Sequence, residues 1–138
     1  MKVRLEDGLP YVTVVLSYRG QQVSLEKVLL DTGSAGTIFS TDRVLTVGLT
    51  MTPQDTIRRV RGVGGTEFVF TKRVDRLALD DFGLDNFEIE VGAMQYGVEL
   101  DGILGVDFLT RVGAVIDLAQ MKVYSTPQKD RNNADNRQ

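Results

Sequence analysis

Residues 27–40 read KVLLDTGSAGTIFS, with an acidic residue between apolar residues and two glycines. Two leucines run directly into a lone acidic residue, Asp31, and Gly33 and Gly36 follow. A carboxylate at the end of a buried strand loses hydration, which is costly unless hydrogen bonds or a proton compensate. The glycines let backbone amides approach closely, and nearby hydroxyls can donate hydrogen bonds: those of Thr32, Ser34 and Thr37. We therefore expect this loop to hold an acid.

Outward from this stretch, the chain is predicted to be mostly strand. Segments rich in Val, Ile, Leu, Phe and Tyr recur at short spacing between Gly, Asp and Asn. We expect a hairpin turning near residues 19–21, a long hairpin with a glycine tip at 62–65, and a last hairpin near 119–120. Brief helices are expected after residue 40 and just before Gly113. The predicted fold class is all-β, mainly β with one or two short helices.

Length and composition indicate one folded domain. The chain has 138 residues, of which 42% are hydrophobic and 25% charged, which is typical of a soluble globular protein. We expect a single domain over 1–125 and a disordered polar tail over 126–138, which has no apolar anchor. The net charge is −3 and the Lys and Arg residues are scattered, so the sequence does not indicate the basic patch of a nucleic-acid-binding protein. No apolar run of about 18 residues and no signal peptide are seen, so no membrane partner and a cytoplasmic location are expected.

Two absences from the sequence narrow the chemistry. The chain has no cysteine and no histidine. Thiol nucleophiles, Ser-His triads, the usual zinc sites and imidazole bases are therefore excluded within this chain. Carboxylate chemistry remains.

The string Leu29-Leu30-Asp31-Thr32-Gly33-Ser34 resembles the active-site signature of aspartic proteases. The single-copy format is similar to that of the retropepsins and their cellular and bacterial relatives. The resemblance covers roughly residues 10–125. It includes a glycine-tipped flap, matched by RGVGGTEF at 61–68, and an apolar-apolar-Gly motif before a short helix, matched by Ile103-Leu104-Gly105. These three motifs in this order are fairly specific, whereas a bare Asp-Thr-Gly is not.

The resemblance implies an aspartic endopeptidase with a closed acid-protease barrel that works as a homodimer. Each chain supplies one catalytic aspartate, Asp31, and the pair shares a single proton across the dimer axis. The ionised carboxylate activates a water that attacks a peptide carbonyl, while the protonated one polarises the carbonyl oxygen. The implied partner is a polypeptide substrate. No metal and no cofactor is implied.

The resemblance also assigns supporting roles. Thr32 would hydrogen-bond across the axis, Gly33 would allow close approach, and the hydroxyl of Ser34 could bond the outer oxygen of the carboxylate. The flap would close over an extended peptide, and it consists of Gly62, Val63, Gly64 and Gly65. Ile103 and Leu104 belong to the core, and Gly105 completes their motif. The sequence continues with Val106-Asp107, where viral members have Arg followed by Asn or Asp, which removes an ion pair of the viral dimer.

Other acidic residues and other functions have to be weighed as well. Asp101 precedes a strand and Asp107 begins a helix, where the dipole favours a carboxylate, so both are interpreted as structural. The acidic group of Asp80, Asp81 and Asp85 lacks the spacing of a calcium loop and indicates a solvated turn. The phosphate loop of the actin and sugar-kinase group needs two larger domains. The remaining alternative is a catalytically silent, dimeric peptide-binding or scaffold domain with the same fold.

Overall fold

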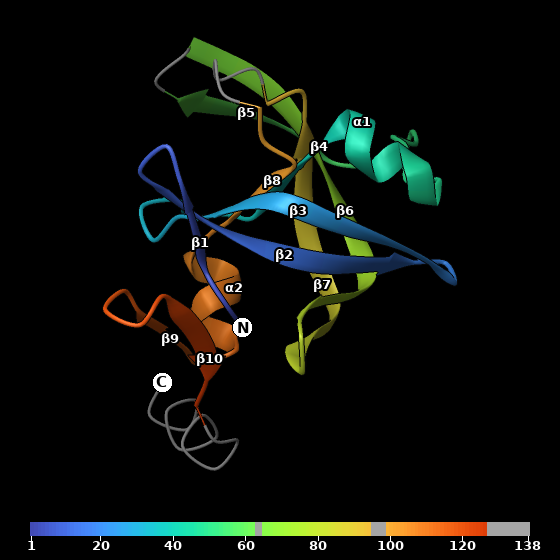
Figure 1. Ribbon diagram of the computed structural model, residues 1–138. Helices are drawn as coiled ribbons and strands as arrows, with labels where there is room; N and C mark the ends of the chain where they lie inside the picture. The colour runs from blue at the N-terminus through green and yellow to red at the C-terminus, as the bar shows by residue number, and fades with distance from the viewer. Residues whose placement is uncertain (63–64, 95–98, 127–138) are drawn as a thin grey trace, which may run out of the picture.

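The computed structural model describes residues 1–62, 65–94 and 99–126 (Figure 1). The strands within these ranges are β1 (Arg4–Glu6), β2 (Leu9–Tyr18), β3 (Gln21–Leu30), β4 (Ile38–Ser40), β5 (Ile57–Gly62), β6 (Gly65–Leu79), β7 (Phe82–Gly92), β8 (Gly102–Leu104), β9 (Ala114–Asp117) and β10 (Lys122–Ser125). The helical elements there are short: α1 (Thr41–Val44), the 3-10 helix η1 (Leu45–Val47) and α2 (Val106–Arg111).

Eight of the strands form one sheet, in the order β1-β2-β3-β8-β4-β7-β6-β5, and β2 also pairs with β6. Most neighbours are antiparallel, but β3 pairs with β8 and β4 with β7 in parallel. The short strand β8 therefore lies between β3 and β4, although about 70 residues separate it from each of them in the sequence. β9 and β10 form a separate hairpin that lies beside α2 at one end of the molecule (Figure 1).

The main core lies on one face of this sheet because apolar residues alternate along the strands. On β2, Val12, Val14 and Leu16 have no exposed surface. Phe108 of α2 packs edge to face on Phe87 of β7, with ring centroids 5.7 Å apart. Each large buried side chain of this kind contributes about 1.5–3 kcal/mol to folding.

A second, smaller apolar cluster is separate from the main core. Its buried members are Ile38, Val69 and Met94, and the partly buried residues packed on it are Val60, Leu100 and Ile103. The register pairs Leu29 with Ile103 and Ile103 with Ile38. Since paired residues point to the same face of a sheet, this second cluster shares its face with Leu29, two residues before Asp31.

The predicted secondary structure is largely confirmed. The first hairpin turns at Arg19 and Gly20, which both have positive φ, and Gly48 ends η1 in the left-handed conformation. Gly113, with φ +64°, follows α2. The fold is mainly β with a few short helices, as predicted, while the closed barrel and the homodimer stay predictions.

Parts of two predictions fall outside the described residues. These are Val63 and Gly64 at the predicted flap tip and residues 127–138 of the predicted tail. Of the helices that the structure describes, none has the length and apolar character needed to cross a membrane.

Candidate active site

Asp31 follows the last residue of β3 and is half-buried. Its backbone amide donates to the carbonyl of Leu104 at 3.0 Å, which fixes the residue to the end of β8. Its carboxylate oxygen Oδ1 accepts a hydrogen bond of 2.9 Å from the amide of Gly33. The carboxylate is thus held by its own loop, while its half-exposed position leaves it accessible to a reactant.

Two hydroxyls that were expected to support this carboxylate bind elsewhere. The Ser34 hydroxyl donates to the carbonyl of Gly36 at 2.8 Å, and the Thr37 hydroxyl donates to Asp107 Oδ1 at 2.7 Å. A hydroxyl has one proton to donate, so neither can donate to Asp31 in this arrangement. The expectation is therefore wrong for both hydroxyls. The Ser34 hydroxyl instead stabilises the loop by binding the backbone carbonyl of Gly36.

A hydrogen-bonded junction joins the Asp31 loop to the start of α2. The Gly105 amide donates to the Thr37 hydroxyl at 3.0 Å, and the amides of Thr37 and Phe108 donate to the carboxylate of Asp107. The Val106 amide donates to the carbonyl of Ser34 at 2.9 Å. Asp107 is therefore structural, as predicted. The part played by Thr37 in this junction could not be predicted, because its partners lie about 70 residues away.

Gly105 is required at this junction because two backbones approach each other closely there. A Cβ at this position would lie 2.4 Å from the carbonyl oxygen of Gly36 and 2.7 Å from that of Ser34. Both atoms belong to the backbone and cannot rotate away. Within the same motif, Leu104 is fully buried in the main core, and Ile103 packs on the second cluster.

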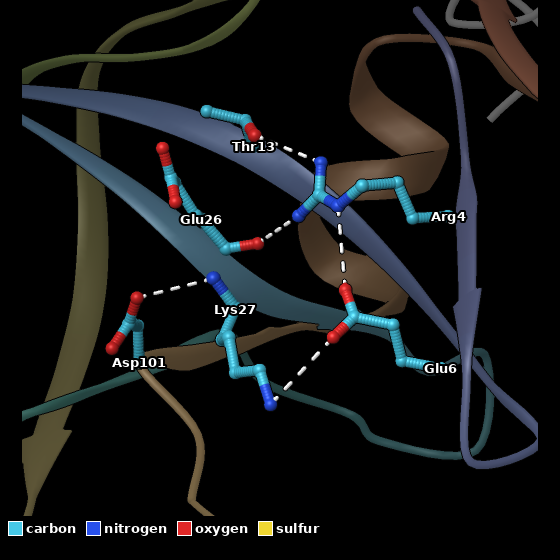
Figure 2. Close-up of polar contacts among 6 residues, drawn as sticks. All are labelled: Arg4, Glu6, Thr13, Glu26, Lys27 and Asp101. Carbon is cyan, nitrogen blue, oxygen red and sulfur yellow. Dashed lines mark hydrogen bonds and ion pairs between the residues drawn. The ribbon is translucent and has the colours of Figure 1, made fainter.

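Asp101 is also structural, as predicted. Its carboxylate accepts a hydrogen bond of 3.1 Å from the amide of Lys27 and pairs with Arg43 at 3.1 Å. The amide of Asp101 donates to the carbonyl of Lys27 at 2.9 Å. Asp101 thereby ties the start of β8 to β3 (Figure 2), and its pair with Arg43 ties it to α1.

Of the acidic group that was assigned to a solvated turn, Asp80 and Asp81 lie in the turn between β6 and β7. The prediction is wrong for Asp85, which lies within β7 and pairs with Arg76 of β6 at 2.9 Å.

A charged network joins β1 to β2 and β3 (Figure 2). Arg4 donates to the hydroxyl of Thr13 at 3.0 Å and to the carbonyl of Glu26. Glu6 pairs with Arg4 at 3.4 Å and with Lys27 at 3.7 Å. Lys27 precedes Asp31 by four residues, about 13 Å along an extended strand. Opposite charges are thus matched between β1 and β3, one stretch of strand away from Asp31.

The predicted flap corresponds to the β5–β6 hairpin. Gly62 and Gly65 are paired in its register, and Val60 of β5 packs on the second cluster together with Ile103. The arm of the hairpin is therefore in contact with the face of the sheet that also bears Leu29. The structure thus brings together Asp31, its loop, the Gly105 motif and the described part of the hairpin.

Comparisons with known proteins agree with this arrangement. The profile of the aspartyl protease family matches residues 13–108, so the chain belongs to this family. Among solved structures, the chain is similar to a retropepsin-like aspartic protease from Rickettsia conorii, with a TM-score of 0.64 and 17% identity over 89% of this chain and 95% of that chain. The fold is therefore retropepsin-like. A search of curated protein sequences gives no significant match.

Thr37→Val is expected to lower the free energy of unfolding by about 2–3 kcal/mol, because Thr37 is 1% exposed and its loss leaves the buried Gly105 amide without a partner and removes one of the hydrogen bonds to Asp107 Oδ1. Denaturant unfolding followed by circular dichroism measures the change. Thr46→Val removes an exposed hydroxyl that bonds only a local carbonyl and serves as the control. A loss below about 0.5 kcal/mol in Thr37→Val would contradict the junction.

Proposed function

We propose that this protein is an aspartic endopeptidase that hydrolyses peptide bonds at a homodimer interface, with one catalytic Asp31 from each subunit. The observation that carries the proposal is the half-buried carboxylate of Asp31, held by its loop at the end of β3 beside the second apolar cluster. Membership of the aspartyl protease family and the retropepsin-like fold support it. The catalytic unit corresponds to residues 1–125.

The proposed chemistry needs two carboxylates close together. At about 3 Å, two negative charges repel by roughly 5 kcal/mol at an effective dielectric of about 20, so the pair holds one proton. The ionised carboxylate takes a proton from a water molecule, and that water attacks the peptide carbonyl carbon. The protonated carboxyl donates a hydrogen bond to the carbonyl oxygen, and the carboxyl that took the proton from water passes it to the leaving amine when the C–N bond breaks, which restores the starting pair. Each chain contributes half of this acid-base pair.

The second subunit is proposed to cover the face around the end of β3. Thr32 and Gly33 are exposed there, which suits the proposed cross-axis hydrogen bond of Thr32 and the close approach at Gly33. The network of Arg4, Glu6 and Lys27 (Figure 2) joins β1 to the strand that leads to this face, β3. Exposed ion pairs contribute little to stability by themselves, but partial burial against the second subunit would strengthen their attraction.

The second cluster is proposed to line the substrate groove. Its partly buried members, Val60, Leu100 and Ile103, offer apolar surface next to the Asp31 loop. An extended peptide can pair its backbone with such a groove and place alternate side chains into it. The flap, Gly62 to Gly65, is proposed to close over that peptide. The substrate class is therefore an extended polypeptide with apolar side chains near the cleaved bond.

Digestion of a mixed peptide library, read by mass spectrometry, tests this function. Cleavage products in the wild-type digest that are missing from an Asp31→Asn digest support it, and the residues flanking the cut sites report the specificity. If the protein binds library peptides as a confirmed dimer but cuts none of them, the silent peptide-binding domain takes the place of the endopeptidase.

Specific activity is expected to fall as the enzyme is diluted through its dimer dissociation constant. The reason is that the dimer fraction falls with protein concentration while each monomer holds only half of the site. Well below that constant, a tenfold dilution should lower activity per milligram by about tenfold. Initial rates across a dilution series, compared with sedimentation measurements, check this. Constant specific activity under confirmed monomeric conditions would argue against a shared site.

A further inference from the structure

Glu90 on β7 contacts both the Asp31 loop and the β5–β6 hairpin. Its Oε2 atom lies 3.1 Å from a guanidinium nitrogen of Arg58 on β5. Its Oε1 atom lies close to Gly36, since a Cβ added to Gly36 would be only 2.9 Å from this oxygen. The Glu90 amide donates to the carbonyl of Thr37 at 2.9 Å. One carboxylate thus has one oxygen against the loop and the other against the hairpin.

The sheet register places this pair on the face that bears the second cluster. Glu90 pairs with Ile38 of β4 and with Thr71 of β6, and Arg58 pairs with Val69 of β6. Ile38 and Val69 are buried members of that cluster. The ion pair therefore crosses β6 on the groove side, directly beside the apolar surface that is proposed to receive the peptide.

The fold disfavours the charged form of Glu90 at this position. The Glu90 side chain is only 16% exposed, whereas that of Arg58 is 60% exposed. Burial raises the pKa of Glu90, Arg58 lowers it, and the carboxylates of Asp107 and Glu88 raise it further, with a net rise. A raised pKa in the folded state means that stability falls as pH rises through the titration of Glu90. Ionisation of Glu90 thus lowers the stability of the fold.

We propose that Arg58 and Glu90 are a positioning pair that holds the β5–β6 hairpin in register with the Asp31 loop and so sets the affinity for the peptide substrate. The inference rests on the proposed peptidase function. Neither residue needs to touch the scissile bond. The pair acts by fixing the distance between the β5–β6 hairpin and the Asp31 loop, which form the two sides of the groove. When the pair is broken, part of the free energy of peptide binding is used to restore that distance.

Glu90→Gln is the main test, since it keeps the shape and removes the charge. We expect KM to rise about 5-fold while kcat stays within about 2-fold. Arg58→Gln should have the same effect, Arg58→Lys a smaller one, and the double Gln variant no more than either single one, because both changes break one interaction. Asp85→Asn breaks the exposed Arg76 pair between β6 and β7, far along the same strands, and should change neither constant.

Stability separates positioning from plain structural support. At neutral pH, Glu90→Gln should melt at or above the wild-type temperature, and the difference should shrink as the pH falls below the ordinary glutamate range. The variant is expected to melt higher because Gln cannot carry the negative charge that burial disfavours, whereas Glu90 of the wild type carries it at neutral pH. Amide hydrogen exchange in β5 should be faster in Glu90→Gln than in wild type or Asp85→Asn, since the hairpin loses its anchor.

The remaining outcomes each decide the proposal. A lowered melting temperature in Glu90→Gln would show that the pair is structural. A raised KM with unchanged amide hydrogen exchange in β5 would show that Glu90 contacts the substrate directly. Either result overturns the positioning role. Unchanged KM also overturns it. If a confirmed wild-type dimer cuts no peptide, the peptidase function fails, and peptide affinity by titration calorimetry and hydrogen exchange still decide whether the pair positions the hairpin.

Discussion

Asp31→Asn is expected to reduce peptide cleavage by about 10⁴-fold or more without unfolding the protein. An amide can neither accept the proton of the attacking water nor share a proton with the opposite carboxylate, so acid and base functions are lost together. The fold should persist because Asp31 is half-buried and its backbone amide still donates to Leu104. Turnover of a library-derived peptide, with circular dichroism as the check on folding, measures both effects.

Two further measurements make this result specific. Asp81→Asn changes an exposed carboxylate in the turn between β6 and β7 and should leave turnover unchanged. Excess Asp31→Asn protein added to the wild type should lower its activity, because mixed dimers contain one carboxylate where the mechanism needs two. If Asp31→Asn keeps its turnover, the chemistry lies elsewhere in the molecule. If mixing has no effect, the two subunits do not share a site.

Gly105→Ala is expected to destabilise the fold by about 3 kcal/mol or more and to abolish activity. The added Cβ would meet two backbone carbonyls, at 2.4 Å from Gly36 and 2.7 Å from Ser34, and overpacking against backbone forces the chain to move. The movement would separate the Asp31 loop from α2 and break the bond from Gly105 to Thr37. Denaturant unfolding gives the loss of stability by linear extrapolation.

Gly36→Ala is the matched control for the effect on stability, since it adds the same methyl group to the same junction. Its nearest obstacle is the Glu90 Oε1 atom at 2.9 Å, at the far end of a flexible side chain that can rotate. The loss of stability should therefore stay below about 1 kcal/mol. Equal losses of stability in both variants would show that the close backbone approach at Gly105 is not the cause of the destabilisation.

Local signals in the sequence were enough to predict the elements of the fold. Alternating apolar residues predicted the long strands, and glycine at the turns and helix ends predicted where they stop, as at Gly20, Gly48 and Gly113. The strand that ends at Asp31, and the Gly105 motif before a short helix, were also predicted correctly. Such signals are reliable because φ preferences and side-chain alternation act between neighbouring residues.

The hydrogen-bond partners in the site could not be predicted in the same way. Ser34 and Thr37 were expected to donate to Asp31, yet they donate to Gly36 and Asp107. Glu90 gave no signal at all, since a glutamate that alternates with apolar residues in a strand is expected to be solvent-exposed. Each of these outcomes depends on which distant segment lies next to the loop, and hydroxyl and carboxylate groups bind whatever partner is within reach.

The amino-acid pattern alone was enough to predict a mainly β protein, a carboxylate directly after a buried strand, and a chemistry without cysteine or histidine. The insertion of β8 between β3 and β4 is known only from the folded chain, because these contacts join segments about 70 residues apart. The same insertion brings Thr37, Gly105 and Asp107 together and leaves Glu90 between loop and hairpin. Contacts of this kind follow from how sheets pair and pack, which no local pattern specifies.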